Sequence, residues 1–116
     1  MRLESLHELL GQEELVPQAI LRIPIERLAV QHSIKLEVGA DDFDKYVGAA
    51  FRLDDTRFAI MHYAGHPDGT STIYLPYSIN DVVKISYFIS KIASELGLSA
   101  TDFEWQRKDD LTKSAS

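Results

Sequence analysis

Residues 46–77 constrain the fold more than any other part of the chain, because they contain strand-like runs joined by tight-turn sequences. In residues 46–53, apolar side chains alternate with small or polar ones, which is the period of a strand that buries one face. The pair Asp54-Asp55 suits a tight turn, and residues 58–63 form a second run that is apolar on both faces. The sequence therefore predicts a β-hairpin here.

A second hairpin follows directly. Pro67-Asp68-Gly69 predicts a turn, since proline presets the backbone angle φ of the first central position and glycine accepts a positive φ. Residues 70–75 are rich in β-branched and aromatic side chains, and Pro76 ends the run. Two hairpins in series predict a meander of three antiparallel strands.

Helical patterns flank this meander on both sides. Apolar residues recur every three or four positions in residues 3–10, 13–23 and 25–32, which predicts a series of short N-terminal helices. The same spacing predicts one long helix over residues 80–96, and Gly97 suits its C-terminal cap.

Two short strands complete the expected sheet. Apolar residues alternate with polar ones in residues 34–38 and again in residues 103–106. The predicted fold class is α+β, with a small, mainly antiparallel sheet of four or five strands, N-terminal helices and one long helix packed on the sheet. We expect residues 1–107 to form a single domain and residues 108–116 to be a frayed tail.

Composition and charge exclude several classes of function. The 116 residues include no cysteine, so disulfides and thiolate chemistry are excluded. The formal net charge is −6 and the basic residues are scattered, so we do not expect nucleic acid as a partner. No apolar run approaches the ~20 residues of a membrane-spanning helix, and the acidic N-terminus is unlike a signal peptide. We expect a cytoplasmic protein that does not enter a membrane.

The chain carries no motif of a known chemistry, such as a nucleophile elbow, a P-loop or a dinucleotide fingerprint. His62 and His66 are four residues apart near Asp68, but a strand end followed by a turn need not bring such ligands together as a helix would. Residues 24–29 and 34–36 resemble the helix-to-strand lead-in of ImmA/IrrE-type metallopeptidase domains, yet the zinc-binding HExxH helix of that family is absent. We therefore expect no metal and no cofactor, and we favour a non-enzymatic role.

Two surfaces are candidates for binding a protein partner. The acidic segment before the first hairpin could steer a basic partner, while aromatic side chains within it anchor the complex. The predicted long helix has a wide apolar arc, which could leave a patch for a partner or for a homodimer. The predicted partner-binding residues are Asp41, Asp42, Phe43, Asp44, Tyr46, Val83, Tyr87 and Phe88.

The function that these features favour is a non-enzymatic protein-binding module, such as a small acidic inhibitor, an immunity or antitoxin-type protein, or a regulatory adaptor. The alternative is a small enzyme or ligand-binding domain with a pocket between the sheet and the long helix. The polar lining of that pocket would come from His62, Tyr63, His66 and Tyr74. A buried, converging cluster of these side chains would favour the enzyme, and an exposed patch with an aromatic rim would favour the binding module.

Overall fold

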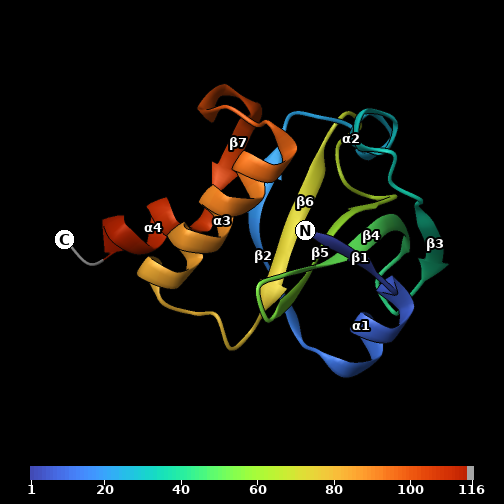
Figure 1. Cartoon of the computed structure of the whole chain (residues 1–116), viewed down its shortest axis with the longest axis horizontal. Helices are drawn as coiled ribbons and strands as arrows, with labels where there is room; N and C mark the ends of the chain where they lie inside the picture. The colour runs from blue at the N-terminus through green and yellow to red at the C-terminus, as the bar shows by residue number, and fades with distance from the viewer. Residues whose placement is uncertain (115–116) are drawn as a thin grey trace.

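The protein has the predicted α+β architecture in a computed structural model that describes residues 1–114 (Figure 1). Within these residues, seven strands form one fully antiparallel sheet, which is more than the four or five strands expected. The strands are β1 (Arg2–Glu4), β2 (Leu15–Leu21), β3 (Glu37–Ala40), β4 (Lys45–Leu53), β5 (Thr56–Tyr63), β6 (Ser71–Pro76) and β7 (Phe103–Gln106). The helices are α1 (Leu6–Gln12), α2 (Ile25–His32), α3 (Val82–Leu96) and α4 (Arg107–Ser114), with a 3₁₀ turn at Ala100–Asp102.

The predicted meander is confirmed as the middle of this sheet. The strand order is β1-β4-β5-β6-β2-β7, and β3 lies beside the N-terminal half of β4. Leu53 pairs with Thr56, so the loop between β4 and β5 is the pair Asp54-Asp55, in which Asp54 has a φ of 55°. Gly69 has a φ of 78° in the second turn, as the sequence predicts.

Strand β2 corrects the helix that was predicted over residues 13–23. Val16 pairs with Leu75 and Ala19 pairs with Ile73, with a β-bulge between Pro17 and Ala19. Leu75 and Ile73 are two residues apart and so face the same side of the sheet, which means that Val16 and Ala19 also do. The extra residue of the bulge therefore gives a strand the three-residue apolar spacing of a helix.

Smaller differences occur at the two ends of the chain. Residues 2–4 form a strand, so the first predicted helix is shortened to α1. The strand predicted over residues 34–38 begins later, at Glu37. Helix α4 occupies residues for which a frayed tail was expected, and the Trp105 indole N–H donates a hydrogen bond of 2.7 Å to Asp110 on this helix.

Helix α3 matches the predicted long helix closely. It begins after the capping residue Asp81 and ends at Gly97, whose φ of 66° is the left-handed conformation that a C-terminal glycine cap adopts. None of the described helices, including the 15 residues of α3, is long and apolar enough to cross a membrane.

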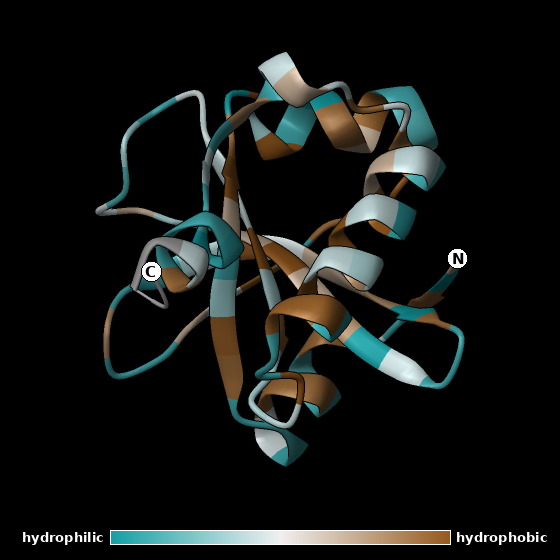
Figure 2. Cartoon of the chain, turned by 90° about the vertical axis from the view of Figure 1, so that its left-hand side faces the viewer, coloured by the Kyte–Doolittle hydropathy of each residue, from teal (hydrophilic) through white to brown (hydrophobic). Residues whose placement is uncertain are grey.

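The two faces of the sheet are covered differently. Helices α2 and α3 bury one face in the main core, which includes Phe51, Phe58 and Ile89. Helix α1 covers the opposite face over β4 and β5, where Leu6 and Leu9 pack against Ala50, Ala59 and Met61. Figure 2 shows hydrophobic residues concentrated in the strands and hydrophilic residues in most loops.

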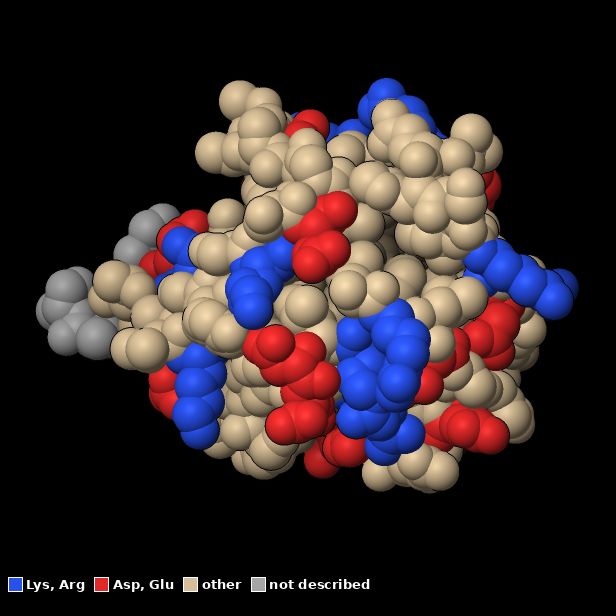
Figure 3. Space-filling model, in the orientation of Figure 1, with Lys and Arg blue, Asp and Glu red and all other residues tan. Residues whose placement is uncertain are grey.

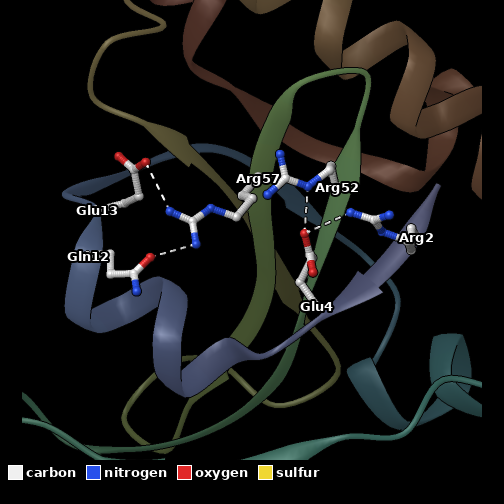
Figure 4. A network of polar contacts seen from close by, with 6 residues as sticks. All are labelled: Arg2, Glu4, Gln12, Glu13, Arg52 and Arg57. Carbon is white, nitrogen blue, oxygen red and sulfur yellow. Dashed lines mark hydrogen bonds and ion pairs between the residues drawn. The ribbon is translucent and has the colours of Figure 1, made fainter.

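Ion pairs fasten the N-terminal segment to this second face (Figure 4). The Arg52 guanidinium donates a hydrogen bond of 2.6 Å to Glu4, and Arg52 is the main cause that lowers the pKa of the Glu4 carboxyl. The neighbouring Arg57 donates to Gln12 at 2.8 Å and pairs with Glu13 at 3.4 Å. Helix α1 is thereby held over β4 and β5, and its apolar cluster extends to Tyr74 of β6 and Leu15 of β2.

Candidate functional site

Beside α1, on the same face of the sheet, β6, β2 and β7 contribute to a groove with an aromatic lining. Tyr74 and Thr72 pair with Ala59 and Met61, so they lie on the face that α1 covers elsewhere. Two hollows of about 460 and 580 Å³ occur here and share Pro17, His66 and Tyr74. The first is also lined by Leu15, Phe43, Asp44, Tyr63 and Gly65. The second is also lined by Ile20, Thr72 and Trp105. We call the two hollows together the aromatic groove.

Tyr63 is the centre of an aromatic cluster in the groove. Its ring lies edge to face with His66, Tyr74 and Tyr46, at centroid distances of 5.6, 6.4 and 5.9 Å. Edge-to-face contacts at these distances are the favoured geometry of aromatic pairs. The rings of Tyr63, His66 and Tyr74 therefore give the groove an aromatic floor that carries hydroxyl and imidazole groups.

The loop between β3 and β4 is fixed to this floor by Asp41. One carboxylate oxygen of Asp41 accepts hydrogen bonds from the backbone N–H groups of Phe43 (2.8 Å) and Asp44 (3.2 Å). The other accepts the Tyr63 hydroxyl at 2.7 Å. The hydrogen bond from this hydroxyl is the largest cause of the lowered pKa of Asp41. The pKa of Tyr63 is raised, first by its burial and then by its hydrogen bond to Asp41. The loop is thus ordered, and it holds the Phe43 side chain 90% exposed beside the groove.

The charges of the groove differ from those of the surface seen in Figure 3. On that view, Lys and Arg lie beside Asp and Glu. Ion pairs elsewhere in the described residues include Arg2 with Glu4 and Arg57 with Glu13. In the groove, Asp44 is the one lining residue of these four types among the described residues. The Asp44 side chain accepts the Lys45 backbone N–H at 2.8 Å through one of its two oxygens. The groove is therefore apolar with a negative end.

The structure brings together two sets of residues that the sequence treats as alternatives. Phe43 and Asp44, from the predicted partner-binding set, line the same hollow as Tyr63, His66 and Tyr74, from the predicted ligand pocket. Asp41 and Tyr46 contact Tyr63 directly, and Asp42 is exposed in the same loop.

Other predicted residues lie elsewhere. His62 follows the alternation of β5 to the opposite face and lines a separate hollow of about 650 Å³ beside β3. Val83 and Tyr87 are exposed on α3, where the Tyr87 hydroxyl donates to Asp54 at 2.9 Å. Phe88 is only 9% exposed and belongs to the main core, so it cannot form part of an exposed patch.

The position predicted for a ligand pocket is also corrected. Core side chains fill the space between the sheet and α3, where Phe51 stacks on Phe58 at a centroid distance of 5.3 Å and Ile85 and Ile92 are fully buried. The hollow that Tyr63, His66 and Tyr74 line is on the other face of the sheet.

The groove residues that were not predicted from the sequence are Leu15, Pro17, Ile20, Gly65, Thr72 and Trp105. Pro17 and Ile20 were assigned to a helix, which hid their pairing with β6. Trp105 was placed in a strand, but its pairing with Ile20 is a long-range contact with no local signal. No local pattern marked Thr72 as a site residue, because its place in the groove depends on the pairing of β6 with β2. The one available warning was Pro17, since proline within a predicted helix favours another structure.

No group of three or more His, Asp or Glu side chains is arranged to hold a metal ion within the part of the chain that the structure describes. The rings of His62 and His66 have centroids 6.4 Å apart. In comparisons with known proteins, no family model, no curated protein and no solved structure matches this chain.

Proposed function

We propose that the protein is a non-catalytic binding module that holds a basic protein partner in the aromatic groove. The observation that carries this proposal is Phe43, a large apolar side chain that is 90% exposed beside a groove lined with aromatic rings. Exposed aromatic anchors next to an apolar depression are typical of protein interfaces, in which a few such residues supply most of the binding energy.

The polar groups of the groove support binding rather than catalysis. The Tyr63 hydroxyl donates a hydrogen bond to one oxygen of Asp41, and the other oxygen accepts the backbone N–H groups of Phe43 and Asp44. These bonds use both groups to position a loop. A protein of this kind acts by occupying a surface of its partner, as inhibitors, immunity proteins and adaptors do.

The charge of the groove supports a basic partner. Asp44 lines it, and Asp41 and Asp42 lie in the same loop, while no Lys or Arg of the described residues lines either hollow. Charges at the rim of an interface mainly set the association rate and its dependence on salt. Buried aromatic contacts mainly set how long the complex lasts.

Affinity capture from the native host with three bait proteins tests the proposal. The baits are the wild type, Phe43→Ser, and the matched control Val30→Ser, which removes an 82% exposed apolar side chain from α2. We expect the wild type and Val30→Ser to capture a basic protein, and Phe43→Ser to lose it. The purified partner should then bind Phe43→Ser at least about tenfold more weakly, as for an interface anchor. Equal binding by all three baits would refute the proposed site.

Association kinetics with the purified partner test the steering role of the loop. Asp42→Lys is the suitable variant because Asp42 is exposed, whereas Asp41 holds the loop and its replacement would also change the structure. We expect Asp42→Lys to slow association at low salt and to reduce its salt dependence. The matched control is Asp55→Lys, an equal charge reversal at the opposite end of β4. Equal association rates for the two variants would argue against steering by the loop.

A further inference from the structure

The loop between β3 and β4 carries Asp41, Asp42 and Asp44, and we call it the acidic loop. The end of the aromatic groove nearest this loop has the composition of a site for an organic cation. The rings of Tyr63, His66 and Tyr74 surround one hollow of about 460 Å³, together with Phe43 and the Asp44 carboxylate. The faces of aromatic rings attract ammonium and guanidinium groups, and a carboxylate adds a full negative charge. The hollow is large enough for the end of one long side chain.

One oxygen of Asp44 is accessible for such a contact. Its Oδ1 accepts the Lys45 backbone N–H at 2.8 Å, while its Oδ2 accepts no hydrogen bond from the described residues. A side chain at position 65 would begin 3.0 Å from this Oδ2, so Gly65 keeps the oxygen open to the hollow. The backbone bond orients the carboxylate, and the missing side chain exposes it.

The floor of the site is also held in place. Tyr74 is buried in the sheet, and Tyr63 is fixed by its hydrogen bond to Asp41. A cation therefore meets rings that lose little conformational freedom on binding, which is the condition under which weak contacts give useful affinity.

We infer that this end of the groove binds the side-chain cation of a lysine or arginine on the protein partner. The inference rests on the proposed function and adds to it the residue type that the partner presents. An anionic side chain would be repelled by Asp44, and a neutral one would leave the Asp44 carboxylate without a charged partner.

Titration of the protein alone with small cations, followed by ¹H–¹⁵N NMR, tests the inference. The probe is n-butylammonium chloride, with n-butanol as the neutral match and sodium chloride at equal ionic strength as the salt control. We expect n-butylammonium to cause saturable shifts of the amide signals of Asp44, Gly65 and His66, and we expect no such shifts with n-butanol or sodium chloride. Methylguanidinium chloride, run in parallel, shows by its relative affinity whether arginine or lysine suits the site better.

Two variants locate the charge that is responsible. Asp44→Asn keeps an oxygen for the Lys45 N–H and should weaken n-butylammonium binding by roughly threefold or more, as for loss of an ionic contact at a partly exposed site. Asp42→Asn removes the same charge from a neighbouring residue that does not line the hollow, and should leave binding within about twofold of wild type. Shifts that n-butanol reproduces, or affinity unchanged in Asp44→Asn, would overturn the inference.

These outcomes are separate from a failure of the proposed function. If Phe43→Ser loses the partner while the small cations bind without regard to Asp44, the cation site is wrong and the interface stands. If Asp44→Asn weakens cation binding while Phe43→Ser captures the partner normally, the hollow binds a cation but the partner docks elsewhere, and the assignment of that cation to the partner is wrong.

Discussion

Asp41 shows how one side chain can organise a whole site. It accepts backbone N–H groups within its own loop and the hydroxyl of Tyr63 from β5, so a surface loop is tied to the sheet. Hydrogen bonds from these donors lower the pKa of Asp41, and the bond from Tyr63 has the largest effect. The stabilisation that Asp41 provides is therefore present above the ordinary pKa of an aspartate and is lost as the pH falls through the lowered value.

Replacing Tyr63 by phenylalanine tests this arrangement. Tyr63→Phe removes the hydroxyl donor, so we expect the pKa of Asp41 to rise toward the ordinary aspartate value. Carboxyl ¹³C NMR titration of Asp41 measures this change directly. Tyr46→Phe is the control, since Tyr46 contacts the Tyr63 ring without a hydrogen bond to Asp41. An Asp41 pKa that is the same in Tyr63→Phe and wild type would contradict the account of the loop.

Gly48 is a second residue whose identity the structure dictates. A Cβ at this position in β4 would lie 2.7 Å from the Met61 side chain and would also meet the Ile60 carbonyl oxygen of β5. Backbone cannot move aside easily within a paired sheet. The absence of a side chain therefore allows β4 and β5 to pair here.

We expect Gly48→Ala to lower the free energy of unfolding by about 1–3 kcal/mol, the usual cost of overpacking. Gly11→Ala is the matched control, because a Cβ at Gly11 in α1 would meet no atom within 4 Å among the described residues beyond its chain neighbours and the backbone of its own helix. That change should instead stabilise by about 0.5–1 kcal/mol, as alanine does in helices. Urea denaturation of both variants provides the comparison, and equal stabilities would show that β4 and β5 do not approach so closely.

At the scale of elements, β2 decides where the groove lies. It is the strand that joins the meander to β7, and its side chains Pro17 and Ile20 form part of the groove floor. Its bulge leaves Gln18 fully buried, and neither polar atom of its side chain has a hydrogen-bond partner among the residues that the structure describes. A buried amide without a partner costs free energy, so this position carries a local penalty.

An apolar side chain of similar size should remove that penalty. We expect Gln18→Met to raise the free energy of unfolding by about 1 kcal/mol, since the desolvation cost of the amide disappears. Gln31→Met, an exposed change on α2, should have little effect. Thermal and urea unfolding measure both changes. A loss of stability in Gln18→Met would mean that the amide forms hydrogen bonds that stabilise the bulge.

The elements also show which predictions a single sequence supports. The meander and α3 were predicted because their signals are local: alternation in β4, the turn at Gly69 and the cap at Gly97. Strand β2 was missed because its bulge mimics helical spacing, and the pairing that stabilises it comes from β6, more than fifty residues away along the chain. Phe43, Tyr63, His66 and Tyr74 were predicted as site residues and Trp105 was not, because the face that these residues share depends on such long-range pairing.

At the scale of the molecule, the sheet has one closed face and one half-open face. Helices α2 and α3 supply the main core on the closed face, whereas α1 lies over β4 and β5 on the other. The aromatic groove occupies the remaining half, and the acidic loop stands at its edge. The fold is thus stabilised largely by one face, which leaves part of the other available for a partner.

Site-specific photo-crosslinking in the native host tests this central claim most directly. The photoreactive residue p-benzoylphenylalanine is placed at Phe43 or at Trp105 in the groove, and at Tyr87 on the outer side of α3 as the matched aromatic control. The account predicts one basic protein crosslinked from both Phe43 and Trp105 and absent from the Tyr87 sample. Crosslinking of that protein from Tyr87, with none from Phe43 or Trp105, would contradict it and would place the interface on α3.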